Sequence, residues 1–230
     1  MYMSLTKRML QDYIVRQLDM FFPDEISARD AIFHAAFDLA LDRQEFCLSH
    51  ISLPGYTRDD NANFSHLYAD QYSTFLYYLS NSIWQMHGDE RICSKLILLN
   101  KMLNGCWFSY KAKLPNIFVL GHPVGTVLAN ADCEDYLVVF QNVTVNTDYT
   151  TTGDTPHLGK GLILFAGAKI IGGEPSGDHV TIGVDATVYK QEIPSNTLVY
   201  RDRSGTICMK EHGERSYFYD YFKKDGVYRT

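Results

Sequence analysis

Aliphatic residues recur every six positions through much of the second half of this chain. Between Leu158 and Val188 the series is broken only at Ser176. An α-helix repeats near 3.6 residues and a simple strand near 2, so neither explains a period of six. Hexapeptide repeats are typical of a parallel β-helix, whose short strands each send an aliphatic side chain inward. The residues expected to point inward are Leu114, Leu120, Val143, Leu158, Leu164, Ile170, Ile182 and Val188.

The first hundred residues have a helical spacing instead. Apolar residues between Leu10 and Phe21 recur every three or four positions, which places them on one face of a helix. Three further helices are expected, the first of these capped by Ser27. The four helices are predicted to end near Pro23, Ser49, His87 and Leu103.

These two patterns divide the chain. We expect an α+β protein with a helical N-terminal domain over residues 1–107, a parallel β-helix over residues 108–200 and a C-terminal cap or tail over residues 201–230. The tail carries six aromatic residues between Tyr217 and Tyr228. Because the last coil of a β-helix exposes unpaired strand edges, we expect the tail to cover that end. An oligomer contact or a part of the acceptor site is the alternative.

A polar segment, Asn146–His157, interrupts the six-residue rhythm. It contains Gly153 and Pro156, which break regular structure, so we expect a loop that leaves the coil there. Loops on a rigid scaffold often shape its binding site. A solvated insertion without a function is the alternative interpretation.

Composition narrows the range of functions. The 230 residues carry a formal net charge of −6, which does not favour nucleic acid or an anionic membrane as a partner. No apolar run approaches the roughly 18–20 residues of a membrane span, and the N-terminus is a poor signal peptide. Five scattered cysteines without a CxxC pair fit a reducing cytoplasm. The histidines show no HxH or HxxxH spacing, so no metal site is expected.

Four segments of the chain resemble bacterial serine acetyltransferases. They are Asp70–Leu79, Gly121–Val127, Phe140–Val145 and Ala166–Gly172. The chain looks closer still to the serine-acetyltransferase-like enzymes of surface-polysaccharide gene clusters, which share His-Pro-Val-Gly-Thr-Val and a closing Ile-Pro-Ser-Asn. The resemblance covers about residues 65–200. It implies a left-handed β-helix, assembly as a homotrimer or hexamer, and acetyl-CoA bound along the groove between neighbouring coils.

The resemblance also implies roles for single residues. His122 lies where the family has its catalytic base. Ala166, Gly167 and Val184 lie where the main chain of the family contacts the pantetheine arm of acetyl-CoA. A histidine suits the proton step of acetyl transfer, because its ordinary pKa of about 6.5 is close to neutral pH. No covalent nucleophile is required, since the thioester is already activated.

Other groups of the family are replaced in this chain. Trp107 falls where the family has the acid that orients the histidine, and a tryptophan cannot do that. We expect a backbone carbonyl to orient His122 instead; the alternatives are Asp132, Glu134 and Asp135.

The groups that hold serine in the family are also replaced. Gly121 stands for a carboxylate, and Asp154 and Thr155 stand for an Arg-His pair. These replacements favour an acceptor other than serine.

Further candidates have weaker support. Lys169 and Lys190 could meet the phosphates of CoA, although surface lysines are commonly only solvated. Asp70, Tyr72 and His157 could contact the acceptor, although a helix cap, a structural contact and a solvated loop are the respective alternatives.

The functional hypothesis is an acetyl-CoA-dependent O-acetyltransferase. Its acceptor would be a small polar molecule, a sugar in surface-polysaccharide synthesis. One alternative is a true serine O-acetyltransferase of cysteine synthesis. Another is a β-helix scaffold or regulatory partner without catalytic activity.

Overall fold

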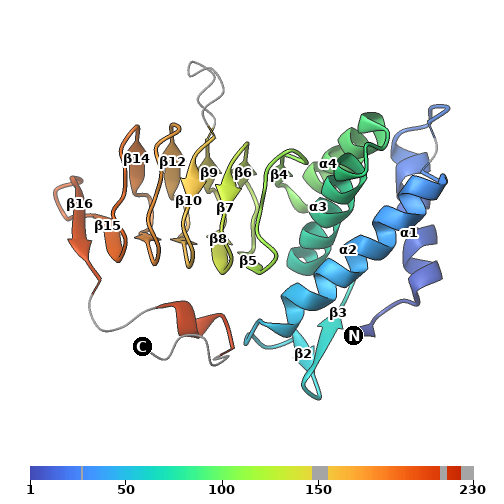
Figure 1. The fold of residues 1–230 in the computed structure, drawn as a ribbon, viewed down its shortest axis with the longest axis horizontal. Helices are drawn as coiled ribbons and strands as arrows, with labels where there is room; N and C mark the ends of the chain where they lie inside the picture. Colours follow the sequence, from blue (N-terminus) through green and yellow to red (C-terminus); the bar gives the residue numbers. More distant parts are fainter. Residues whose placement is uncertain (27, 147–154, 213–216, 224–230) are drawn as a thin grey trace.

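Four α-helices form the N-terminal part of the structure, a computed structural model that describes residues 1–26, 28–146, 155–212 and 217–223. They are α1 (Lys7–Phe21), α2 (Ala31–Ser49), α3 (Ala69–Gln85) and α4 (Glu90–Asn104). Figure 1 shows them together at one end of an elongated molecule. Helix α3 is central, since every residue from Asp70 to Ile83 is buried. A small sheet of β1 (Tyr2–Met3), β3 (Asn61–Phe64) and β2 (Thr57–Arg58) lies beside the helices.

Local chemistry sets the ends of these helices. The side chains of Thr6 and Asp30 accept hydrogen bonds from the first-turn N–H groups of α1 and α2. Helix α4 ends at Gly105, whose φ of 66° is in the left-handed region that glycine adopts readily. Ser27, the expected cap of the second helix, lies outside the described residues, and Asp30 caps that helix. None of the helices in the described residues is long and apolar enough to cross a membrane.

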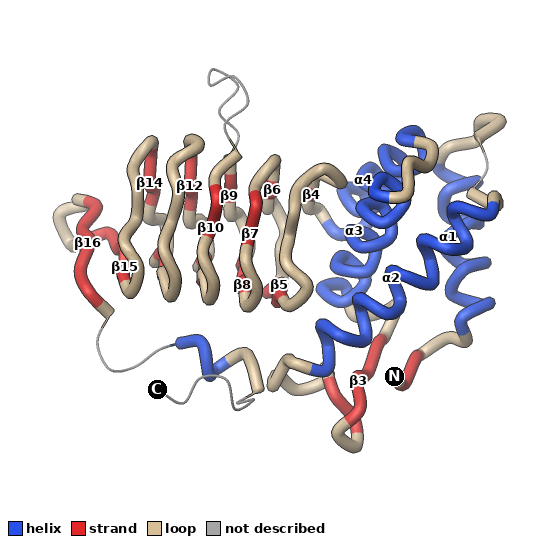
Figure 2. The backbone as a smooth tube through the Cα atoms, viewed as in Figure 1, coloured by secondary structure: helices blue, strands red, loops and turns tan. Residues whose placement is uncertain are grey.

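The chain then winds through three stacked faces (Figures 1 and 2). Face 1 consists of β5 (Phe118–Gly121), β8 (Leu137–Phe140), β11 (Ile163–Leu164), β13 (Thr181–Ile182) and β15 (Thr197–Arg201). Face 2 consists of β4 (Trp107–Phe108), β6 (Val127–Leu128), β9 (Thr144–Val145), β12 (Lys169–Ile171) and β14 (Thr187–Tyr189). Face 3 consists of β7 (Asp132–Cys133), β10 (His157–Leu158) and isolated bridges. The pairings between coils are parallel.

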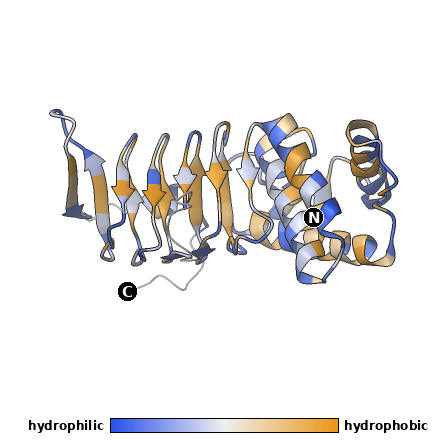
Figure 3. Ribbon diagram, turned by 90° about the horizontal axis from the view of Figure 1, so that it is seen from above, coloured by the Kyte–Doolittle hydropathy of each residue, from blue (hydrophilic) through white to orange (hydrophobic). Residues whose placement is uncertain are grey.

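One coil takes 18 residues, or three six-residue repeats. Leu164 pairs with Ile182, and Ile170 pairs with Val188. The eight residues predicted to point inward are all buried, with at most 4% of their surface exposed. Figure 3 shows hydrophobic residues concentrated along the stacked strands. The inward positions predicted from the rhythm are therefore confirmed as core positions.

The one break in the rhythm remains part of the core. Ser176 is buried and forms bridges with Leu158 and Ile193, so it occupies the inward position of its repeat. Its hydroxyl oxygen accepts a hydrogen bond from the Gly159 N–H at 3.3 Å. This satisfied hydroxyl explains how the core tolerates a polar residue there.

The upstream phase differs from the predicted one. Val139, rather than Leu137, pairs with Leu120 and Leu164. Val143 consequently lies two residues before the position that pairs along face 2. It is still buried, because residues two apart in a strand point to the same side.

The C-terminal tail does not cover the end of the stack as predicted. Strand β16 (Ile207–Glu211) pairs antiparallel with β15 at that end. The described aromatic residues follow in the short 3₁₀ helix η1 (Tyr217–Asp220) and run back along the coils toward α2 (Figure 1). The physical reason is that the outward residues of face 1 are also apolar: Val119, Val138 and Ile163 are each at most 2% exposed. A layer over this face buries more apolar surface than a cap over the last coil would.

Truncation of one inward side chain tests the packing. Ile182→Ala should lower the free energy of unfolding by about 2–5 kcal/mol, because it leaves a cavity in a buried row. Val184→Ala, two residues away and 60% exposed, should change it by less than about 0.5 kcal/mol. Denaturant unfolding measures both values. Equal effects of the two variants would contradict the assignment of the inward row.

Candidate functional site

The turn that carries His122 is longer than the matching turn of the next coil. Gly121 pairs with Phe140 and Val127 pairs with Thr144, so five residues connect β5 to β6 where three connect β8 to β9. The extra residues place His122 at φ 51°, a conformation that histidine tolerates better than most side chains. Its side chain is 84% exposed. The longer turn therefore presents the imidazole at the surface of the coil.

A buried carboxylate lies against this histidine. Asp70, in the first turn of α3, accepts a hydrogen bond from the His122 backbone N–H at 3.2 Å. The same carboxylate oxygen is 3.7 Å from the His122 Nδ1, and the side chain of Asp70 is only 6% exposed. Asp70 is thus the acid beside His122. It was predicted only as an acceptor contact, and the expected backbone carbonyl is not the partner that the structure places there.

The predicted alternatives lie elsewhere. Asp132, Glu134 and Asp135 follow the strand segment of face 3, away from the turn between faces 1 and 2. The sequence missed the role of Asp70 because 52 residues separate it from His122. Its place at a helix N-terminus, where the helix dipole favours a negative charge, was the available clue.

Corner residues of successive coils continue from His122 along one edge. The Asn142 N–H donates to the Val124 carbonyl, the Gly167 N–H to the Gln141 carbonyl, and the Asp185 N–H to the Ala166 carbonyl. These bonds stack the His122 turn, the Gln141 turn, Ala166–Gly167 and Val184–Asp185 in register. Because adjacent strands lie about 4.8 Å apart, three coil steps span about 14 Å. We call the row of His122, Ala166, Gly167 and Val184 the His122 edge.

Close packing along this edge requires a glycine. Gly167 has a φ of 73°, and a Cβ atom there would lie 2.1 Å from an Asp185 carboxylate oxygen. A side chain at position 167 is thus excluded by both conformation and space. The backbone of the edge is left accessible to a ligand.

The other candidate residues are dispersed. Lys169 starts β12 next to the edge, and its ammonium group donates to the Gly167 carbonyl at 2.8 Å. Lys190 follows β14, at the far side of face 2 from the edge. Tyr72 is 3% exposed and donates its hydroxyl to Gln17 at 2.5 Å, so it does not face the edge. The assignment of Tyr72 to the acceptor is therefore contradicted by its burial.

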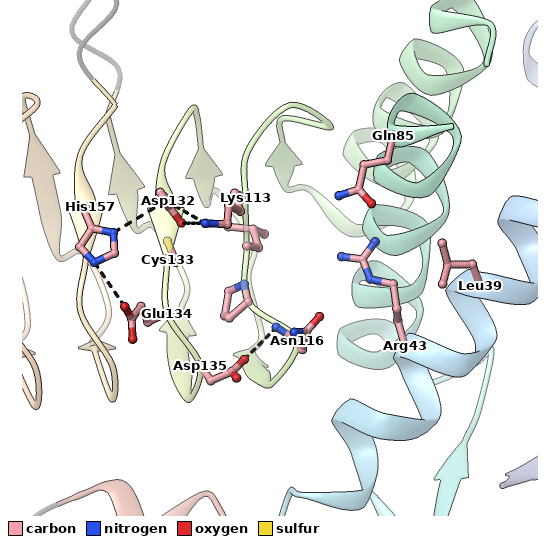
Figure 4. Close-up of a pocket in the computed structure, with 12 residues that line it drawn as sticks. Leu39, Arg43, Gln85, Lys113, Asn116, Asp132, Cys133, Glu134, Asp135 and His157 are labelled. Atoms are coloured by element: carbon pink, nitrogen blue, oxygen red, sulfur yellow. Dashed lines mark hydrogen bonds and ion pairs between the residues drawn. The ribbon is translucent and has the colours of Figure 1, made fainter. Parts of the chain in front are cut away.

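His157 lies on face 3, in a different hollow (Figure 4). A cavity of about 580 Å³ separates this face from α2 and α3. In it His157 is 3.4 Å from Glu134 and 3.8 Å from Asp132, which also pairs with Lys113 at 2.8 Å. Arg43 points into the cavity from α2 (Figure 4). Within one chain, His157 therefore does not join His122.

The positions that depart from the family pattern have structural reasons or lie out of view. Gly121 borders the ring of Phe140, and a Cβ atom there would lie 2.8 Å from that ring. Trp107 is half-buried in β4, where it lines a hollow of about 370 Å³ beside Gly125. Asp154 lies outside the described residues, and Thr155 is exposed. Within the described part of the chain, no three His, Cys, Asp or Glu side chains are grouped to hold a metal ion.

Comparisons with known proteins return serine acetyltransferases. The chain is 29% identical over 103 residues to one from Synechococcus elongatus, a match that spans 44% of this chain and only 42% of that protein. No family model matches the sequence. Isoform 3 from Entamoeba histolytica, solved with cysteine, has a TM-score of 0.60 at 17% identity, covering 89% of this chain and 74% of its own.

A second solved structure has the same architecture. The Brucella abortus enzyme, solved with coenzyme A, has a TM-score of 0.57 at 16% identity, covering 90% of this chain and 75% of its own. The chain therefore shares the fold of these structures, a helical N-terminal region followed by a β-rich region.

The environment of Asp70 leads to a prediction about pH. Burial raises the pKa of Asp70 above its ordinary 3.8, and the His122 N–H and ring offset only part of that shift. The folded state therefore keeps this proton to higher pH than the unfolded state, and the resulting stability is lost as pH rises from about 4 through the folded pKa. Asp70→Asn removes this titration. Relative to wild type, its free energy of unfolding should rise across that window and then level off, as measured by denaturant unfolding at several pH values. A difference that stays constant from about pH 4 upward would contradict the raised pKa.

Proposed function

We propose that this chain is an acetyl-CoA-dependent O-acetyltransferase, and that its coils form a left-handed parallel β-helix of the hexapeptide type. One observation carries the proposal: His122 with the buried Asp70 lies at one end of an edge that also holds Ala166, Gly167 and Val184. This row brings together the residues that the resemblance assigns to proton transfer and to the pantetheine arm. The shared fold with an acetyltransferase solved with coenzyme A supports it.

The chemistry follows from this arrangement. The His122 imidazole accepts the proton of the acceptor hydroxyl while the hydroxyl oxygen forms a bond to the thioester carbonyl carbon. The C–S bond then breaks, and the proton passes from His122 to the leaving thiolate of CoA. Asp70 stabilises the imidazolium formed between these steps, because it places a carboxylate 3.7 Å from Nδ1. A positioned base of this kind contributes about 10²–10⁴-fold to the rate.

Asp70 also weakens the case for a scaffold without activity. That alternative rested on Trp107, which replaces the acid that orients the histidine in the family. In this chain a different acid, from α3, contacts His122. A scaffold has no need of a buried carboxylate, which is unfavourable to stability unless it is paired.

Two acceptors are candidates. Similarity to serine acetyltransferases, one of them solved with cysteine, favours serine. The loss of the family's serine-holding groups at Gly121 and Thr155 favours a hydroxyl compound without an amino acid's charges, such as a sugar. The edge itself requires only a hydroxyl placed beside His122.

We further propose that the chain works as a homotrimer or a multiple of it. The edge is exposed in a single chain, with Val124 and Val184 beside it 62% and 60% exposed. A neighbouring copy would cover these apolar side chains. It would also be the route by which His157, on face 3, could reach a His122.

Light scattering measures the assembly directly. We expect a mass about three or six times the 26.3 kDa of one chain. Val184→Glu, which places a charge in the covered patch, should lower that mass without unfolding the chain. A wild-type particle of single-chain mass would rule out the trimer.

His122→Asn tests the catalytic role. Turnover should fall by about 10²-fold or more, because the proton-transfer contribution is lost. The affinity for CoA should remain nearly unchanged, since the imidazole lies at the acceptor end of the edge. His34→Asn, at an exposed histidine of α2, is the matched control and should retain full turnover. Free CoA release measures turnover, and undiminished release by His122→Asn would refute the role.

A further inference from the structure

The described C-terminal segment, Tyr217–Lys223, carries two rows of aromatic side chains. Phe218 and Phe222, four residues apart, are 4% and 1% exposed and pack on Tyr136 with ring centroids 4.9 and 5.2 Å away. The backbone of the segment is tied to the end of α2: the Ser52 N–H donates to the Tyr221 carbonyl, and the Lys223 N–H donates to the His50 carbonyl. This row and these bonds hold the segment against face 1.

The second row faces the solenoid edge instead. Tyr217 packs edge-on against Phe165, with centroids 5.7 Å apart, and Tyr221 packs edge-on against Phe140, at 6.1 Å. Phe140 and Phe165 are themselves stacked at 5.4 Å with their planes 21° apart. All four rings are half-buried, so each keeps part of its surface exposed. We call these four residues the aromatic wall.

The aromatic wall borders the His122 edge. Phe165 directly precedes Ala166, and Phe140 pairs with Gly121, the residue before His122. Gly121 continues the Phe165–Phe140 row without a side chain. A Cβ atom there would lie 2.8 Å from the Phe140 ring, so the ring occupies the place where a carboxylate side chain would begin. At the acceptor end of the edge, an aromatic surface therefore replaces a charged one.

We propose that the aromatic wall binds the acceptor and that this acceptor is a pyranose sugar. The inference rests on the proposed acetyl transfer. A sugar ring offers hydroxyl groups for acetylation together with a face of C–H groups, and such a face packs on aromatic rings. Free serine carries two opposite charges and needs charged partners. The one ionisable side chain in contact with His122 within the described residues is Asp70, which is buried and already accepts the His122 N–H.

The tyrosine at the acceptor end has a suitable polar group. Burial, with smaller effects of Asp220 and Tyr217, raises the pKa of Tyr221, so its hydroxyl stays protonated at neutral pH. A protonated hydroxyl can donate a hydrogen bond to a sugar oxygen, while the ring supplies apolar contact. The reaction is the one described above: the sugar oxygen takes the acetyl group, the C–S bond breaks, and the hydroxyl proton goes to the CoA thiolate through His122.

Kinetics with Tyr221 variants test the proposal in the full chain. The probes are a panel of methyl hexopyranosides and free serine, with CoA release as the readout. Tyr221→Ala should raise KM for the best pyranoside by about 10-fold, because it removes the ring contact, and should leave KM for acetyl-CoA unchanged. Tyr221→Phe, which keeps the ring, should recover most of that loss. Tyr219→Ala, on the same helical turn but packed on Phe218, is the matched control and should behave as wild type.

The outcomes separate this proposal from the reaction itself. If wild type uses serine better than any pyranoside, or if Tyr221→Ala leaves the pyranoside KM unchanged, the acceptor proposal is wrong while the acetyltransferase remains. If no acceptor releases CoA, the proposed reaction is wrong. Binding of the methyl hexopyranosides, followed by saturation-transfer NMR, then decides the wall alone. Binding that Tyr221→Ala abolishes supports the wall, and no binding to wild type overturns it.

Discussion

The hydrogen bonding between successive coils is the constraint on which the rest of the structure depends. Parallel strands pair in one register because a shift by one residue would turn every inward aliphatic side chain outward. With 18 residues in each coil, this register also aligns the corners. The Val124, Gln141 and Ala166 carbonyls each accept from the following coil. The buried rows therefore position exposed residues that never touch the core, and the His122 edge is a result of that alignment.

The sequence predicted what depends on periodicity. A period of six identified the coils, helical spacing identified four helices, and the inward residues proved to be core residues. Contacts between elements follow no spacing rule, so the pairing of Asp70 with His122 could not be derived from the pattern. The tail was assigned to the end of the stack because only that edge was foreseen to need cover. The apolar outer residues of face 1, such as Val138, could not be distinguished from inward ones in strands buried on both sides.

The residues at the head of the edge are unfavourable when taken singly. Asp70 is a carboxylate buried enough for its pKa to rise, and His122 adopts a positive φ without being glycine. Such features persist where the surrounding structure holds them in place. Here α3 is buried along most of its length, and the coil below the turn is paired on both sides. The rigid parts of the fold thus maintain a local arrangement that a short turn could not keep by itself.

The bridge between Ile51 and Phe222 has a consequence for how the molecule is made. It joins an early helix to nearly the last described residue, and closing so long a loop carries a large entropy loss before any contact compensates for it. Coils, in contrast, pair with neighbours only a few residues apart in synthesis. A chain emerging from the ribosome can therefore assemble the His122 edge coil by coil, whereas the aromatic wall must wait for the C-terminus to be released.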